Sequence, residues 1–375
     1  MPNTMAHLTN AAHTGSSSQQ NPTLRSMPPV DDNEDLVVDY QEIIEDVSSI
    51  SESTIASSNT SVASSVLDYR LENGRTYHKY KDGKYYVPND EREKDRLDLQ
   101  HNMFLLMLEN KLGSAPPNER GTKVGRTLDL GTGSGIWAME FGDEHPEAEV
   151  FGVDLSATWP NYVGPNVKFV IDDVEEAWTY DKPFDYIHSR MMASSIGDWE
   201  KYIQKCFDNL KAGGYLELNE FDIIPTSDDG SLRKDSAMLK SAKMIKQAAA
   251  IFGRPFRDVV GLADLMKGIG FTDVYIKRFR WPTNAWPRDP RHKELGLWNN
   301  ENITSGWEGF CMAPFTRALN WTREEVLLLM DQVRHEFNDK SIHAYFNVWS
   351  IHGRNPTAEA IGFGGGDCAI WVEND

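Results

Sequence analysis

The sequence predicts an α/β fold in which a largely parallel sheet carries helices on both faces. From Arg126 onward, strand-like apolar segments alternate with segments whose apolar residues have helical spacing, and this alternation is typical of parallel sheets. A glycine-rich turn follows the first strand directly, and an acidic residue lies at the end of each of the first three strands. Together these features indicate a Rossmann-like fold with a ligand site at the strand ends.

The elements can be predicted in chain order. A helical pattern covers 90–112, with Leu97, Phe104, Leu105 and Leu108 at apolar spacing. Strands are expected at 127–130, 150–153, 167–171, 184–188, 215–221 and 274–279. The helices between them are expected at 135–145, 199–210 and 257–268. An inserted helix over 232–252 and helices rich in Trp and Met over 285–340 are expected to form a cap above the sheet.

The first 66 residues differ in composition from the rest of the chain. Ser-rich stretches surround an acidic patch at 31–46, and the block holds nine acids and one base, Arg25. Few of its residues are large and apolar, so burial cannot offset the entropy of ordering, and we expect a disordered tail over 1–66. The apolar segment 36–44 is the exception and could fold on a regulatory protein partner. The folded domain is expected over 67–356, followed by a C-terminal tail over 357–375.

The charge balance and the cysteines exclude several classes. Lys and Arg total 38 against 57 Asp and Glu, a net charge of −19, which argues against nucleic acid because backbone phosphates need clustered basic residues. The three cysteines are far apart and form neither a disulfide framework nor a metal motif. No apolar run approaches the roughly 20 residues that span a bilayer, and the N-terminus lacks a secretory signal. We expect a cytoplasmic or nuclear protein without a membrane partner.

The turn after the first strand is the most informative segment. Gly131, Gly133 and Gly135 follow an apolar strand and lead at once into a helix. Glycines allow positive φ and close approach of the backbone to a ligand, although buried structural glycines produce similar patterns. A dinucleotide site favours G-x-G-x-x-G, but here Ile136 occupies the third position and Asp129 would face a pyrophosphate. A nicotinamide dehydrogenase therefore fits poorly.

The same features suit S-adenosylmethionine (SAM), which has no phosphate and carries an ammonium and a sulfonium. Asp129 could orient the ammonium, directly or through water, while the glycine turn admits the methionine moiety. Asp154, with Leu155 beside it, could accept the ribose hydroxyls, as the acidic residue does in related nucleotide folds. Asp173 could accept the adenine amino group, with the Val174 backbone as neighbour. Three acids at three successive strand ends arise rarely by chance.

A methyl acceptor that starts protonated needs a base, and His188 is the catalytic candidate because it closes the predicted fourth strand. A structural histidine, hydrogen-bonded at the strand end, is the alternative. Arg190 could bind an acidic substrate bidentately or form a surface ion pair. Glu217 and Glu220 flank the end of the fifth strand, where a solvated face accounts for at least one of them.

Aromatic residues provide further candidates. Tyr77 and its neighbours could close over the cofactor, since aromatic faces attract a sulfonium; packing of an N-terminal arm is the alternative. Other aromatic residues of the expected cap could line an apolar acceptor pocket or simply fill the core: Trp281, Trp286, Trp298, Trp307 and Phe310.

Several motifs together resemble the fungal LaeA-like methyltransferases, from about Glu72 to Pro356. They are Glu72–His78, Asp95–Asp98, Leu128–Trp137, Gly152–Asp154, Phe184–His188, Met312–Phe315 and Ile342–Tyr345. The resemblance implies a class I methyltransferase with a seven-stranded sheet, whose last strand, at 343–351, is antiparallel and follows a helix over 323–337. It also implies transfer from SAM to a small-molecule or protein acceptor, in an enzyme of a biosynthetic cluster or in a regulator of secondary metabolism.

Overall fold

The computed structural model describes residues 69–81 and 83–357. The tail expected over 1–66 lies outside the described residues, and so does the tail expected over 357–375 apart from its first residue.

Seven strands form one sheet in the order β5-β4-β3-β6-β7-β9-β8. Their bounds are β3 (Arg126–Leu130), β4 (Glu149–Asp154), β5 (Val167–Ile171), β6 (Phe184–Arg190), β7 (Leu210–Phe221), β8 (Thr272–Pro282) and β9 (Tyr345–Arg354). The first five are parallel, and β9 lies between β7 and β8, antiparallel to both. The Rossmann-like α/β fold with a seven-stranded sheet and an antiparallel last strand is therefore confirmed. The chain turns from β4 on one side of β3 to β6 on the other, which creates a crevice at the strand ends.

Helices cover both faces of the sheet. On one face, α2 (Ile136–Glu144) packs Trp137 and Phe141 against Val150 and Tyr186. On the other face, α3 (Trp199–Asp208) and α5 (Val259–Ile269) cover a second core that contains Leu128. Consecutive residues of β6 belong to different cores, as the alternation of side chains along a strand requires.

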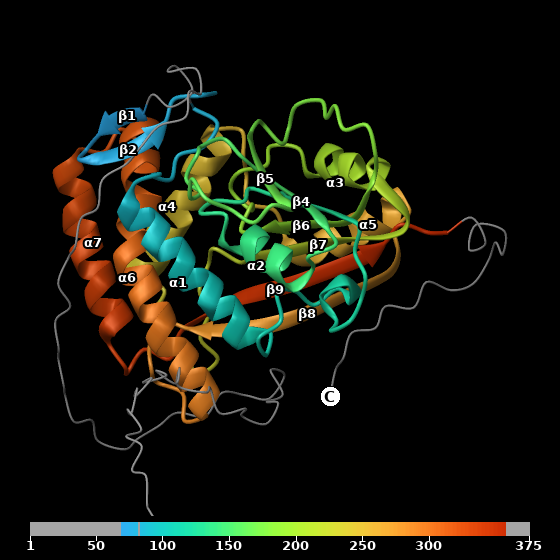
Figure 1. Ribbon diagram of the computed structural model, residues 1–375. Coiled ribbons are helices and arrows are strands. Elements are labelled where there is room, and N and C mark those ends of the chain that lie inside the picture. The colour runs from blue at the N-terminus through green and yellow to red at the C-terminus, as the bar shows by residue number, and fades with distance from the viewer. Residues whose placement is uncertain (1–68, 82, 358–375) are drawn as a thin grey trace, which may run out of the picture. The chain divides into compact units, whose positions relative to one another are not determined.

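The segments expected to form the cap, 232–252 and 285–340, contain α4 (Ala237–Ile251), α6 (Pro290–Ala318) and α7 (Arg323–Asn338). These helices lie beside the sheet together with α1 (Glu91–Met107) (Figure 1). Met238 of α4, Met312 of α6 and Met330 of α7 share a third core with Phe346 of β9. Most of the Trp- and Met-rich segment thus fills this core. A one-turn helix, η1 (Pro116–Asn118), links α1 to β3.

Two local features differ from the sequence prediction. Helix α1 ends at Met107 rather than near residue 112, because Glu109 and Asn110 adopt positive φ values of 57° and 62°. The N-terminal arm forms an antiparallel hairpin of β1 (Tyr69–Glu72) and β2 (Arg75–His78). Its Asn73-Gly74 turn has positive φ at both residues, as a type I′ hairpin requires, and this signal was missed.

Candidate cofactor and acceptor site

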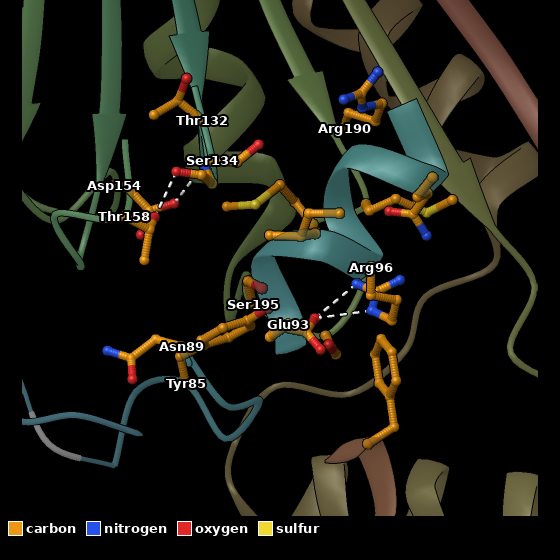
Figure 2. Close-up of a pocket in the computed structure, with 18 of the residues that line it drawn as sticks. Tyr85, Asn89, Glu93, Arg96, Thr132, Ser134, Asp154, Thr158, Arg190 and Ser195 are labelled. Atoms are coloured by element: carbon orange, nitrogen blue, oxygen red, sulfur yellow. Dashed lines mark hydrogen bonds and ion pairs between the residues drawn. The ribbon is translucent and has the colours of Figure 1, made fainter. Parts of the chain in front are cut away.

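A cavity lies at the carboxyl ends of β3 to β6, where α1 and α6 face the sheet (Figure 2). Four short segments of the parallel sheet line it: 131–134, 154–156, 172–175 and 190–195. Cap residues from α1, α6 and the strand ends of β8 and β9 close the opposite side. The cavity therefore forms where the strand order reverses, as the glycine turn and the strand-end acids indicated.

The glycine turn needs its glycines for both conformation and space. Gly131, Gly133 and Gly135 have φ values of +72°, +59° and +81°, a region that other residues rarely adopt. A Cβ on Gly131 would meet Sδ of Met192 at 2.4 Å, and one on Gly135 would meet Phe169 at 2.6 Å. Gly131 and Gly133 line the cavity, whereas Gly135 caps α2 behind them.

Asp154 is fixed at the cavity wall by backbone groups. Its Oδ2 accepts a hydrogen bond from the N–H of Gly133 at 3.0 Å, and its Oδ1 accepts one from the N–H of Ser156 at 3.0 Å. Thr158 Oγ1 donates to the Gly133 carbonyl at 2.5 Å, so the turn is held from the same side (Figure 2). Burial raises the pKa of Asp154, and Leu155 lines the cavity beside it. The carboxylate is thereby presented to a ligand at a fixed position.

Asp173 and Val174 also line the cavity. Asp173 accepts a hydrogen bond from the N–H of Glu175 at 2.9 Å and forms an ion pair with Lys84. Burial raises the pKa of Asp173, whereas its contacts, first of all the hydrogen bond from Lys84, lower it. Together these contacts outweigh burial, so the pKa of Asp173 lies below its ordinary value. Asp173 is therefore a carboxylate at the cavity wall that is already paired with Lys84.

Asp129 and His188 lie behind the cavity rather than in its wall. Asp129 Oδ1 lies 2.7 Å from His188 Nδ1, and its Oδ2 accepts a hydrogen bond from Thr132 Oγ1 at 2.5 Å. The His188 ring stacks on Trp137 with centroids 3.8 Å apart. Both residues are buried, and neither lines the cavity. These positions favour a structural role for His188 and, for Asp129, contact with the ammonium through water rather than directly, and both assignments stay predictions.

The position of His188 follows from the length of its strand. The predicted fourth strand ends at His188, but β6 continues to Arg190. Side chains two residues apart point to the same face of a strand, so His188 remains one step inside the sheet. Arg190, at the end of β6, reaches the cavity instead.

Arg190 is one of the basic residues that line the cavity. Its guanidinium lies 4.8 Å from the Phe104 ring centroid and hydrogen-bonds to Nδ1 of His101. No described carboxylate comes within ion-pair distance of it, so the alternative of a surface ion pair does not apply. Burial lowers the pKa of Arg190 to about 10, and the group remains charged at neutral pH.

Tyr77 is not among the residues that line the cavity, which argues against its predicted contact with the cofactor. It is buried under the Arg317 guanidinium, 4.8 Å from the ring centroid, and packs with Tyr86 and Ala313. The alternative of arm packing therefore describes Tyr77. Tyr85, from the same tyrosine-rich segment, lines the cavity in its place.

Helix α1 contributes residues that the sequence analysis missed. Glu93, Arg96 and Gln100 line the cavity and are buried. Arg96 donates to Glu93 Oε1 at 3.0 and 2.7 Å (Figure 2). It also donates to Asn302 Oδ1 of α6 at 2.8 Å. Their spacing of i, i+3 and i+7 continues the face that Met103 and Met107 bury further along the helix, and this was the available signal.

The cavity continues from these polar residues into an apolar wall. Phe221, Trp281, Ile303, Trp307, Phe310, Phe346 and Val348 line it. The indole N–H of Trp281 faces Sδ of Met107 and that of Trp307 donates to Ser241, so both rings turn apolar surface to the cavity. Of the five cap aromatics considered from the sequence, Trp281, Trp307 and Phe310 line the cavity, while Trp286 and Trp298 do not.

The other two strand-end acids are buried rather than solvated. Glu217 accepts hydrogen bonds from the N–H groups of Ser114 and Ala115, each at 2.8 Å. Glu220 accepts two from Met192 and Ala193, each at 2.8 Å. Neither lines the cavity, but Glu220 holds the segment after β6 that does.

The residues present fit SAM. Gly131 provides a cradle that a Cβ would fill, Asp154 offers a fixed carboxylate, and Arg190 offers a guanidinium without a carboxylate partner among the described residues. Fold and site together define a SAM-dependent methyltransferase of the Rossmann-like class.

Comparison with known proteins identifies the family. Residues 99–276 match a family model described as a methyltransferase domain. The chain is 41% identical over 293 residues to methyltransferase pytC of Aspergillus terreus, which covers 78% of this chain and 90% of that protein. It is 36% identical to the secondary metabolism regulator LAE1 of Cochliobolus heterostrophus, over 76% of this chain and 94% of that protein.

A third relative is the protein-methionine methyltransferase laeA of Emericella nidulans, 35% identical over 76% of each chain. The chain belongs to the LaeA-like family of SAM-dependent methyltransferases, and its cofactor is SAM. Within the described residues no helix is long and apolar enough to cross a membrane.

Proposed function

We propose that the protein methylates a small, largely apolar molecule that binds between α1, α6 and the ends of β7, β8 and β9. The observation that carries the proposal is the apolar wall, which continues directly from the polar residues of the cofactor site within one cavity. Aromatic faces and a few convergent polar groups are typical of small-molecule sites.

The cofactor arrangement is part of this proposal. Asp154 accepts the ribose hydroxyls with Leu155 beside the ring, and Asp173 with the backbone of Val174 receives the adenine amino group next to Lys84. Gly131 and Gly133 admit the methionine moiety. Arg190 binds the methionine carboxylate, because its free donors face the cavity and charge-assisted contacts are the strongest hydrogen bonds available there.

When bound, SAM supplies a methyl group on a sulfonium, which an acceptor displaces in line. The protein therefore has to hold the acceptor close and exclude water. The apolar wall serves both needs. Gln100 is buried at the cavity, and no described residue hydrogen-bonds to its amide, so this amide can orient a polar group of the acceptor.

Labelled methyl transfer tests the acceptor class. The protein is incubated with methyl-labelled SAM and, separately, with a panel of small ring compounds and with histones and peptides. We expect label in the organic-extractable products. Phe310→Trp adds bulk to the apolar wall and should abolish this transfer while leaving affinity for S-adenosylhomocysteine (SAH) unchanged. Label confined to protein would contradict the proposal.

A protein acceptor is the second candidate, because one relative is named a protein-methionine methyltransferase and another a regulator. In that case the N-terminal tail would contact a regulatory partner. Label in the protein fraction that survives Phe310→Trp would favour this candidate.

A further inference from the structure

We propose that His101 is a positioning residue, which in its neutral form holds the Arg190 guanidinium toward the methionine carboxylate of the cofactor. Neither the fold nor the family assigns a role to this histidine. The inference rests on the carboxylate-binding role proposed for Arg190.

The contacts of His101 define its tautomer. The imidazole is buried on α1, and its Nδ1 lies 3.3 Å from both Nη1 and Nη2 of Arg190. Its Nε2 lies 2.8 Å from Glu140 Oε2 on α2. A guanidinium only donates hydrogen bonds, so Nδ1 must accept from Arg190. The ring proton is therefore on Nε2 and is donated to Glu140.

This arrangement leaves Arg190 oriented but not neutralised. His101 contacts both terminal nitrogens from one edge, and the Phe104 ring lies 4.8 Å from the guanidinium carbon. A neutral acceptor fixes the plane of the group without satisfying its charge. The remaining donors of Arg190 can then bind a carboxylate in the cavity. A glutamate in place of His101 would neutralise the guanidinium and prevent this.

Protonation of His101 would reverse this effect, because an imidazolium cannot accept a hydrogen bond and repels a guanidinium. The charged or titratable groups around the pair are Glu140 of α2, Asp98 of α1, Asp129 of β3, and Tyr186 and His188 of β6. Burial, with Arg190 acting in the same direction, outweighs the contact with Glu140 and lowers the pKa of His101. The neutral form thus prevails at neutral pH and is lost as the solution becomes acidic.

The test compares two ligands by calorimetry on the full-length protein. SAH carries the methionine carboxylate, whereas 5′-methylthioadenosine shares the adenosine and the thioether but lacks the amino acid. The ratio of their affinities isolates the carboxylate contact, since effects on Asp154 and Asp173 act on both ligands. We expect the ratio to fall by at least tenfold, on the scale of a charge-assisted hydrogen bond, in Arg190→Met, in His101→Leu and in the wild type at acidic pH.

His101→Asn is the matched control, because its amide oxygen replaces Nδ1 as an acceptor and does not titrate. This variant should keep most of the affinity ratio and show no pH dependence of it. Binding of 5′-methylthioadenosine shows in each case that the variant is folded. If His101→Leu does not fold, the pH profiles of the wild type and His101→Asn decide the question.

The possible failures are distinguishable. An unchanged ratio in Arg190→Met would remove Arg190 from the carboxylate site and contradict that part of the proposed function. A lowered ratio in Arg190→Met with an unchanged ratio in His101→Leu would overturn the role of His101 alone. Wild-type pH dependence in His101→Asn would assign the titration to a group other than His101 and would also overturn the role of His101.

Discussion

At the scale of single residues, buried polar groups hold the segments that line the cavity. His188 illustrates this, because Asp129 depends on it for one of its two side-chain hydrogen bonds. His188→Ala should lower the free energy of unfolding by roughly 2–4 kcal/mol, since it leaves one oxygen of a buried carboxylate without a donor and removes the stacking on Trp137. Urea unfolding measures the change.

His188→Asn is the control for this prediction, because its amide can still donate to Asp129. It should lose less stability than His188→Ala. If His188→Ala has wild-type stability, the histidine does not have a structural role and is again a candidate for the catalytic base.

Glu220 gives a pH dependence of stability. It is fully buried, and burial raises its pKa from 4.5 to about 8. Between these values the folded protein retains a proton that the unfolded chain releases, so stability should fall as pH rises from about 4.5 to 8, by up to about 1.4 kcal/mol per pH unit. Below this window both states are protonated, and above it both are ionised.

Denaturation of the wild type and of Glu220→Gln across pH 5 to 8 checks this sign. The unfolding free energy of the wild type minus that of Glu220→Gln should fall with rising pH, because the glutamate titrates and the glutamine does not. A difference independent of pH would show that Glu220 has an ordinary pKa.

The separation of the site residues along the chain determines which of them could be predicted from the sequence. Gly131, Gly133, Asp154 and Asp173 lie at ends of consecutive parallel strands, and those ends must meet at one edge of the sheet. The α1 residues reach the site only through long-range packing, such as the 2.5 Å contact of Ser134 Oγ with Asp98. No local pattern encodes that contact.

At the scale of elements, α1 and α6 approach closely at one glycine. A Cβ on Gly306 of α6 would lie 2.3 Å from Cδ of Arg96, whose guanidinium is already held by Glu93 and Asn302. Gly306→Ala should therefore displace Arg96 and cost roughly 1–3 kcal/mol through overpacking. Loss of the Arg96 contacts should also disturb the acceptor side of the cavity.

Gly268 of α5 is the matched control, because a Cβ there meets nothing within 4 Å. Gly268→Ala should stabilise the protein by about 0.5–1 kcal/mol through helix propensity. Thermal unfolding of both variants gives the comparison. Equal shifts of the unfolding temperature in the same direction for Gly306→Ala and Gly268→Ala would contradict close packing of α1 on α6.

The elements themselves were largely predictable, since hydrophobic periodicity determines strands and helices locally. Each predicted strand from 127–130 to 274–279 corresponds to a strand of the sheet, with ends shifted by a few residues. The order of the strands and the burial of Tyr77 were not predictable in this way. Both depend on which distant faces pack together, and Tyr77 is covered by Arg317 from the far end of α6.

At the scale of the whole molecule, the described residues that line the cavity all lie between Lys84 and Val348. Removal of residues 1–66 should therefore leave SAH affinity within about twofold of the full-length value, although the deletion removes eight of the nineteen net negative charges. Small changes are expected because exposed charges beyond a Debye length of about 10 Å are screened. A large loss of affinity would mean that the tail belongs to the cofactor site.

The central claim is that this cavity binds SAM with Asp154 at the ribose. Calorimetric titration of the full-length protein and of Asp154→Ala with SAH tests it most directly, with Asp143→Ala on the exposed side of α2 as the control. The wild type and the control should bind alike, and Asp154→Ala should bind more weakly by about 1–3 kcal/mol, the scale of lost buried hydroxyl contacts. Unchanged affinity in Asp154→Ala, or no binding by the folded wild type, would contradict the claim.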